Sequence, residues 1–271
     1  MKAVFEGEAS PMRQVPTFDI LKWAGRTHSA CVIIPVINEG ERISRLLERM
    51  SAIGVSSFAD ILIVDGGSTD GSLEGDIFNN HHVAAILLKR GAGKLSAQLR
   101  CAYAFALDQS YDQIVTIDGN DKDDPVAIEA FIQTIKNGYD FVQASRFKPG
   151  GIGENTPWKR WLAIRLVHAP LLSLASGFVW TDTTQGFRAY SRRLLDDRRV
   201  SVFRDVFMDY ELLAYLNYRA PRLGFRCIEL PSARRYPAFV KAPTKISLTG
   251  EWRLLETLLK VCCGTYNPRD F

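Results

Sequence analysis

The feature that most constrains the fold is a regular alternation of short apolar strands and longer helices between residues 31 and 146. Runs rich in valine and isoleucine have the length of buried strands, and amphipathic helical patterns follow most of them. The expected strands are residues 31–37, 60–64, 83–88, 113–117 and 139–144, and the expected helices are residues 41–53, 94–108 and 125–137. Strands joined by helices of this length pair in parallel through right-handed crossovers, so an α/β fold around a mainly parallel sheet is predicted.

Polar or glycine-rich segments end every one of these strands. The first strand leads into Pro35, Asn38 and Glu39, the second into Asp65 and Ser68, the third into Lys94, the fourth into Asp118, Gly119 and Asn120, and the fifth into Arg146. Ligands of parallel α/β sheets bind beyond the carboxyl ends of the strands. Five polar ends on one edge therefore predict a nucleotide site.

The densest of these ends is the segment 114–125, where a β-branched run leads into four carboxylates and one asparagine within seven positions. Carboxylates this close repel one another unless a cation lies among them, and a divalent metal that carries a diphosphate is the usual cation. The alternative is a solvated turn in which Asp124 only caps the next helix. The segment alone leaves both interpretations open.

Charge and cysteine usage limit the class of partner. The net charge of +4 and the sequence pI near 8.8 suit an anionic ligand or a membrane surface, but they are too weak to indicate a nucleic-acid partner. The five cysteines lack metal-ligand spacing, so reduced thiols in a cytosolic compartment are expected. We expect neither a signal peptide nor a membrane span, since a span needs about 20 apolar residues.

The second half of the chain is less regular. Residues 158–176 predict helices with mixed basic and apolar residues, broken at Pro170. These helices either pack in the core or rest on a lipid surface. Further downstream we expect a helix at residues 208–219, a strand at 225–230 and a terminal helix at 247–261.

The order and spacing of these motifs resemble family-2 glycosyltransferases of the Rossmann-like GT-A fold. The first part of the match comprises residues 33–39, 63–71, 93–94 and the Asp118 cluster. The later part is similar to the dolichol- or polyprenyl-phosphate mannose synthase-like branch, and it comprises residues 145–147, 181–190 and 244–247. The resemblance implies a GT-A domain over residues 31–250, with a nucleotide-sugar-binding half (31–146) and an acceptor or membrane-surface half (147–250). Residues 1–30 would be a lead-in segment and residues 251–271 a C-terminal helix and tail.

The resemblance also implies roles for single residues. The donor nucleotide sugar would contact Pro35, Asn38, Glu39, Asp65, Ser68, Lys94, Asp118, Gly119 and Asn120. A phosphate acceptor would bind basic side chains, because the arginine fork fits phosphate bidentately. The candidates for this role are Arg146, Arg160, Arg165, Arg188 and Lys245, and Asp118, Arg188, Asp182 and Asp209 are the candidates for catalysis.

A divalent metal, Mg²⁺ or Mn²⁺, would be held by Asp118 and Asn120. Three positions depart from the family pattern. Gly66 replaces the second aspartate of an Asp-Asp-Gly-Ser loop, Asn120 replaces the second aspartate of the metal motif, and Lys122 stands where the branch often has glutamine. The Lys122 ammonium would either repel a divalent ion or reach the diphosphate in its place. Alternatively, Lys122 points to solvent and Asp121 or Asp123 completes the ligand set. The metal is expected to be weakly held or dispensable.

The function implied is inverting transfer of a sugar from a nucleoside diphosphate to a polyprenyl phosphate, by a peripheral protein at the cytoplasmic face of a membrane. One alternative is transfer to a glycan hydroxyl in polysaccharide or lipopolysaccharide assembly, which would require a carboxylate base such as Asp182, Asp209 or Glu211. Another is a non-catalytic nucleotide-sugar-binding protein, suggested by Asn120 and Lys122. A dinucleotide oxidoreductase is disfavoured, because no Gly-x-Gly-x-x-Gly follows the first strand. The donor sugar, the acceptor's identity and the oligomeric state do not follow from the sequence.

Overall fold

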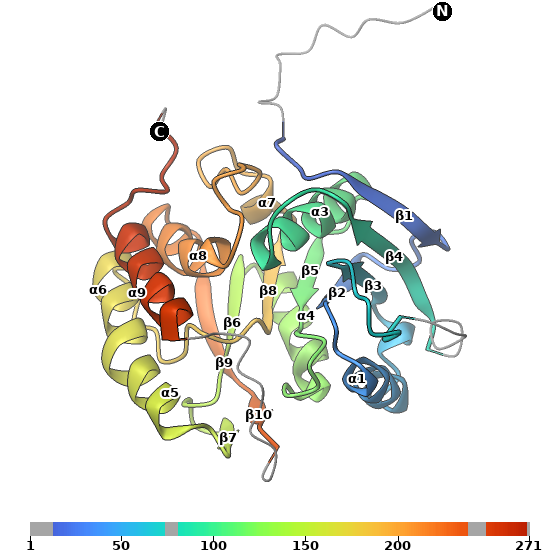
Figure 1. Cartoon of the computed structure of the whole chain (residues 1–271), viewed down its shortest axis with the longest axis horizontal. Helices are drawn as coiled ribbons and strands as arrows, with labels where there is room; N and C mark the ends of the chain where they lie inside the picture. The colour runs from blue at the N-terminus through green and yellow to red at the C-terminus, as the bar shows by residue number, and fades with distance from the viewer. Residues whose placement is uncertain (1–12, 74–80, 238–247, 270–271) are drawn as a thin grey trace, which may run out of the picture.

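The computed structural model describes residues 13–73, 81–237 and 248–269. Within these ranges an eight-stranded sheet runs through the molecule in the order β1-β4-β3-β2-β5-β8-β6-β9 (Figure 1). Its strands are β1 (Phe18–Trp23), β2 (Ala30–Val36), β3 (Asp60–Asp65), β4 (Val83–Lys89), β5 (Gln113–Thr116), β6 (Phe141–Ser145), β8 (Arg188–Ser191) and β9 (Cys227–Pro231). Strands β2 to β5 pair in parallel, as do β6 and β9, whereas β1 and β8 are antiparallel to their neighbours. The predicted α/β fold with a mainly parallel sheet is confirmed.

Helices cover both faces of this sheet. They are α1 (Glu41–Ala52), α3 (Leu95–Asp108), α4 (Ile128–Lys136), α7 (Arg192–Leu195), α8 (Glu211–Arg222) and α9 (Leu248–Cys262), with short 3₁₀ turns at η1 (Val55–Ser57) and η2 (Pro125–Ala127). α1 and α4 contribute to the core on one face, and α3, α8 and α9 contribute to the core on the other. Because neighbouring strand residues point to opposite faces, Ile33 and Ile34 belong to different cores.

A small second sheet connects residues 152–154 and 233–235 to the loop that follows β5. It pairs β7 (Ile152–Glu154) in parallel with β10 (Ala233–Arg235). A β-bridge between Asp123 and Arg234 joins β10 to the loop that follows β5. This bridge brings an arginine more than a hundred positions away into the carboxylate-rich loop.

The helix break expected at Pro170 is wrong. Residues 158–176 are helical throughout, as α5 (Trp158–Ala163), a π-helical turn (Ile164–His168) and α6 (Ala169–Ser176). Pro170 follows the π-helical turn, as the second residue of α6. The π turn just before it replaces the regular α-helical hydrogen-bond pattern at this point.

Two strands of the main sheet lie where the sequence pattern indicated none. β1 falls within residues 1–30, and its outer side chains, such as Ile20 and Leu21, are exposed at the edge of the sheet. β8 has only four residues and lies inside the motif at 181–190. Since β8 pairs with β5 on one side and with β6 on the other, the sheet continues across residue 146. The motif at 181–190 is thus held directly beside Asp118.

Candidate active site

The carboxyl end of β5 is packed tightly on both sides. Gly119 lies against the Pro35 carbonyl, and a Cβ at this glycine would lie 3.1 Å from that oxygen. On the other side, Thr116 Oγ1 donates a hydrogen bond to the Gly186 carbonyl (2.7 Å). A Cβ at Gly186 would overlap the Asp118 carboxylate. Asp118 is therefore fixed between the end of β2 and the later motif that contains Gly186.

The loops after β2 and β3 are tied to each other by hydrogen bonds. Ser68 donates to the Asp65 carboxylate from its hydroxyl (2.7 Å) and its backbone nitrogen (3.0 Å). The same hydroxyl accepts from the Asn38 backbone (3.0 Å), and the Asn38 side chain accepts from Thr69 N (2.8 Å). Three residues predicted to contact the nucleotide sugar, Asn38, Asp65 and Ser68, thus link the two loops at the expected edge of the sheet. Their contacts with a nucleotide stay predictions.

Gln98, on α3, is a residue of this region that the sequence pattern did not single out. Its buried amide donates to the carbonyls of Val36 (2.9 Å) and Val64 (3.1 Å), which holds the ends of β2 and β3 together. A Cβ at Gly66 would lie only 2.9 Å from this amide. The contact accounts for glycine at a position where the resembled family usually has aspartate. A glutamine among the apolar residues of a helix was the available signal.

Every carboxylate in the loop at 118–124 is paired with an arginine. The four carboxylates are Asp118, Asp121, Asp123 and Asp124. Arg234 donates from Nη2 to Asp118 (3.3 Å) and from Nη1 to Asp123 (2.5 Å). Arg49 of α1 donates to Asp121 (2.8 Å) and Asp124 (3.1 Å), and Arg235 also bonds Asp124 (3.2 Å). The cations that this loop requires are guanidinium groups of the chain itself.

The predicted metal ligands do not form the ligand set of a divalent cation. Asn120 Nδ2 faces Asp118 Oδ2 (3.4 Å), and Asn120 Oδ1 accepts from Lys122 N (3.2 Å), so both polar atoms of this side chain are used within the loop. Asp118 also faces Arg234. Across the described ranges, no three His, Cys, Asp or Glu side chains gather in a way that would hold a metal ion. A hard divalent cation needs several oxygen ligands, so these residues do not fit it.

Basic side chains gather beside Asp118 around the Tyr236 ring. Lys122 Nζ lies 5.2 Å and the Arg234 guanidinium 5.7 Å from the centre of this ring. Burial raises the pKa of Tyr236, but Arg234, Arg160 and Arg146 outweigh it and lower the pKa. Burial also lowers the pKa of Lys122, and the charges of Arg234 and Arg160 lower it further. A cluster of cations that repel one another attracts an anion.

Arg146 and Arg160 differ in how they are held. Arg146 is buried and ion-paired with Asp182, Nε to Oδ2 at 2.7 Å, and its Nη1 has no hydrogen-bond partner within the described residues. The side chain of Arg160, on α5, forms no hydrogen bond or ion pair in the same part of the chain. Burial lowers the pKa of Arg160, and Arg234 and Arg146 lower it further while Tyr236 and Asp118 oppose them. Arg165 lies over the Phe147 ring (5.3 Å), on which Arg146 also rests.

Arg188 does not fit the acceptor or catalytic role predicted for it. Its side chain is fully buried, and its guanidinium donates to the carbonyls of Gln185 (2.9 Å), Leu213 (2.7 Å) and Thr183 (3.0 Å). All three nitrogens are therefore committed to the backbone. Arg188 was predicted at the site because it belongs to the motif at 181–190, part of which lies beside Asp118. In β8, however, its side chain points into the core.

The candidate bases are also placed differently from one another. Asp182 is buried and accepts from Arg146 and Gln185 (2.6 Å), so it positions Arg146 and has no access to an acceptor. Asp209 is partly exposed and pairs with Lys94 (3.3 Å) at the start of α3.

Two further predicted site residues are not among the candidate bases. Glu39, predicted to contact the nucleotide sugar, is buried and ion-paired with Arg42 (2.8 Å). Lys245 lies outside the described residues.

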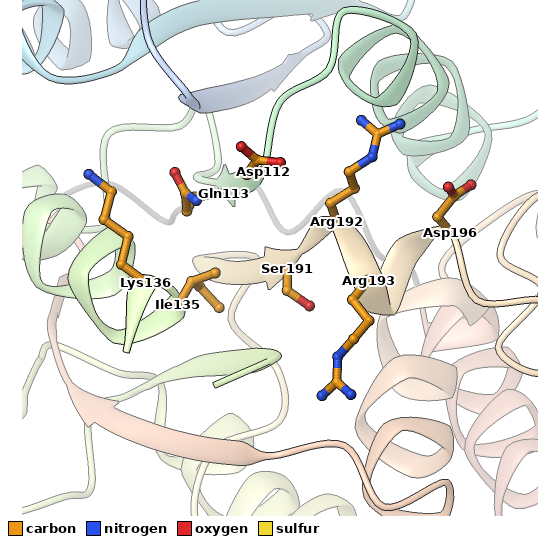
Figure 2. A pocket seen from close by; sticks show the side chains of 8 residues that line it. All are labelled: Asp112, Gln113, Ile135, Lys136, Ser191, Arg192, Arg193 and Asp196. Carbon is orange, nitrogen blue, oxygen red and sulfur yellow. The ribbon is translucent and has the colours of Figure 1, made fainter. Parts of the chain in front are cut away.

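An open cavity of about 490 Å³ lies at the other end of β5 (Figure 2). Asp112 and Gln113 line it together with Arg192 and Arg193. In the register of β5 and β8, Gln113 pairs with Ser191, whereas Thr116, next to the site, pairs with Arg188. This cavity is therefore separate from the candidate active site.

The sheet and its polar carboxyl edge have the organisation of a GT-A transferase, and comparison with known proteins gives the family. Residues 31–199 match the model of glycosyl transferase family 2. The chain belongs to this family and is a glycosyltransferase, as the motifs predicted.

Two curated relatives carry names of the predicted polyprenyl-phosphate branch. Polyprenol monophosphomannose synthase of Mycolicibacterium smegmatis is 28% identical over 211 residues, which cover 76% of this chain and 77% of the relative. Undecaprenyl-phosphate 4-deoxy-4-formamido-L-arabinose transferase of Proteus mirabilis is 29% identical over 177 residues, which cover 63% of this chain. The match spans about half (51%) of that second relative.

Solved structures confirm the GT-A fold. Glucosyl-3-phosphoglycerate synthase from Mycobacterium tuberculosis, in complex with Mn²⁺, UDP and glucosyl-3-phosphoglycerate, superposes with a TM-score of 0.57 at 19% identity, covering 89% of this chain and 81% of that one. Mannosyl-3-phosphoglycerate synthase from Rubrobacter xylanophilus gives a TM-score of 0.58 at 16% identity, covering 87% and 73%. At such identity the likeness concerns the fold.

Proposed function

We propose that this glycosyltransferase moves a sugar from a nucleoside diphosphate to a polyprenyl phosphate at a membrane surface. The observation that carries the proposal is the group of basic side chains beside Asp118, in which the guanidinium of the partly buried Arg160 has no hydrogen-bonding partner in the described residues. The fully buried Arg146 adds a positive charge, and its Nη1 also has no partner there. Guanidinium groups with free donors are suited to a phosphate. The names of the two curated relatives point to the same acceptor class.

Sugar transfer to a phosphate requires no proton transfer to or from the protein. An acceptor phosphate is already anionic, so its oxygen attacks the anomeric carbon without a general base, while the bond to the donor diphosphate breaks on the opposite face. Asp182 holds Arg146 in place from a fully buried position, which orients the acceptor arginine. The alternative glycan-hydroxyl acceptor would need a carboxylate base. Of the candidates for that role, Asp182 is paired with Arg146, Asp209 lies against Lys94, and Glu211 accepts a hydrogen bond from the Asp209 backbone (2.7 Å).

The helix that carries Arg160 also offers an apolar surface. Trp158 is 67% and Trp161 44% exposed on α5, and Trp252 is 75% exposed on α9. In Figure 1, α5 and α6 run along the same side of the molecule as α9, against which α6 packs. No helix in the described parts of the chain has the length and apolarity to cross a bilayer. Exposed tryptophans beside basic residues suit binding at a lipid interface.

Salt-sensitive binding to anionic vesicles is the first expected result. The protein should co-sediment with phosphatidylglycerol vesicles at low salt, and replacing both Trp158 and Trp161 with alanine should weaken partitioning by roughly tenfold. Leu21→Ala, an exposed apolar change on edge strand β1, serves as the control and should have no effect. Equal losses in both variants, or no binding at low salt, would contradict a membrane-surface site on α5.

Arg160→Gln tests the acceptor directly. Loss of one charge-assisted hydrogen bond should lower kcat/KM for a short polyprenyl phosphate by about 10–100-fold, while nucleotide affinity stays within about twofold. The matched control is the exposed neighbour, Lys159→Gln, which should behave as wild type. Transfer is measured from a panel of nucleotide sugars, with a glycan acceptor in parallel. Loss of nucleotide affinity with unchanged acceptor kinetics would move Arg160 to the donor site, and transfer to the glycan alone would refute the acceptor class.

We propose that the protein works at the cytoplasmic face of a membrane in cell-envelope assembly, in line with the acceptors that the relatives' names contain.

We also propose that Mg²⁺ or Mn²⁺ is weakly held or dispensable, because Asn120 adds no charge and Asp118 is already paired with Arg234.

A further inference from the structure

Arg234 occupies the place in the carboxylate loop where a cation is needed. Its backbone is fixed there from both sides: Asp124 N donates to the Ala233 carbonyl (3.0 Å), and Arg235 N donates to the Lys122 carbonyl (2.8 Å). These bonds surround Arg234 in the sequence and clamp β10 to the loop. The backbone position of Arg234 is thus set by this pairing, and its guanidinium is held by contacts of its own.

The guanidinium of Arg234 then bridges two acidic residues. Nη1 donates to Asp123 Oδ2 at 2.5 Å and Nη2 to Asp118 Oδ2 at 3.3 Å, while Nε faces the Tyr236 hydroxyl at 3.4 Å. Arg234 and Asp123 are both almost completely buried, whereas the Asp118 side chain keeps 21% of its surface exposed. A buried arginine between two carboxylates supplies one of the two positive charges that a divalent ion would bring.

The local charge already favours an anion. Asp118 and Asp123 are opposed by Arg234, Lys122 and Arg160, while Arg146 is balanced by Asp182. Three cations therefore face two carboxylates at this edge. A further divalent cation would enter a region of like charge, whereas an anionic phosphate is attracted to it.

We propose that Arg234 and Lys122 together replace the divalent metal in this chain, so that it binds the donor diphosphate and transfers sugar without a metal ion. Arg234 acts as a positioning residue that holds Asp118, and the Lys122 ammonium contacts the diphosphate. As the acceptor oxygen forms its bond to the anomeric carbon, the bond from that carbon to the diphosphate oxygen breaks and its electron pair stays on the diphosphate. The added negative charge is held by these side chains. The inference rests on the proposed function only in taking a nucleoside diphosphate sugar as donor.

The test uses metal-stripped full-length protein and needs no acceptor. Titration with Mn²⁺ followed by electron paramagnetic resonance should show no stoichiometric site, with or without UDP or GDP. Calorimetry should give the same nucleotide affinity in chelator and in Mn²⁺, within about twofold. A stoichiometric Mn²⁺ site that Asp118→Asn removes, or nucleotide binding that appears only with Mn²⁺, would overturn the proposal.

Two variants and one control sharpen the test. Lys122→Gln should lower nucleotide affinity in chelator by about tenfold, the loss of one charge-assisted contact. Arg234→Gln frees Asp118 and Asp123, so it should lose affinity in chelator and gain a Mn²⁺ site that restores it. Arg235→Gln, whose exposed side chain pairs with Asp124 and Glu154, is the control and should match wild type.

If Arg234→Gln does not fold, Lys122→Gln decides the question, since unchanged affinity in that variant refutes the role of Lys122. Failure of the proposed function has a different signature. Metal-independent nucleotide binding without transfer to polyprenyl phosphate would refute the acceptor and leave this inference intact.

Discussion

Asp118→Asn is expected to lower the rate of sugar transfer by about 10²–10³-fold, the usual cost of removing one preorganised charge from an active site. The carboxylate lies at the end of β5, is held against Gly186 and receives Arg234 and Asn120. Asparagine keeps the shape but not the charge, so Arg234 loses one of its two anchors at the point where the donor diphosphate is proposed to lie. The measurement is kcat at saturating donor and acceptor.

The fold should survive this change, because the Asp118 side chain is partly exposed and Asp123 still pairs with Arg234. Asp124→Asn is the matched control from the same loop, since its carboxylate pairs with Arg49 and Arg235, away from the cation cluster. That variant should turn over within about twofold of wild type, as is usual for a surface ion pair. Normal turnover in Asp118→Asn, or an equal loss in both variants, would remove Asp118 from the active site.

The sheet could be predicted because its parallel strands are long, β-branched and regularly separated by helices. Strands β2 to β6 fall within one or two residues of the segments expected from the sequence. β1 escaped prediction because an edge strand has no continuous apolar run, and β8 because four residues inside a polar motif carry too little pattern. The pairing of β8 with β5 is what holds the motif at 181–190 beside Asp118.

The site was predictable where it follows from the fold and not where it depends on distant partners. Asn38, Asp65 and Ser68 meet as expected, because the carboxyl ends of neighbouring parallel strands share one edge. The arginines that pair the carboxylates lie 72 to 116 positions away in the sequence. Local spacing therefore could not show that these carboxylates pair with guanidinium groups of the chain itself.

Arg188 is a single side chain that local spacing placed at the site and that distant contacts bury. Its replacement is expected to have a large effect on stability. Arg188→Met should lower the free energy of unfolding by about 3–5 kcal/mol, because each buried carbonyl left without its donor costs about 1–3 kcal/mol and relaxation recovers part of the sum. The three carbonyls belong to Gln185, Leu213 and Thr183, so the change loosens α8 from the motif at 181–190. Urea denaturation followed by circular dichroism measures the loss.

The control for this experiment is Arg165→Gln, in which an exposed arginine of the π turn is replaced, and its unfolding free energy should stay within about 0.5 kcal/mol of wild type. Acceptor kinetics of the folded fraction separate the two possible roles of Arg188. A structural role predicts an unchanged KM for the acceptor, because no nitrogen of this guanidinium is free to reach a phosphate. If Arg188→Met is as stable as wild type but has a raised acceptor KM, then Arg188 binds the acceptor, as the motif first suggested. The guanidinium would then leave its buried position in the active enzyme.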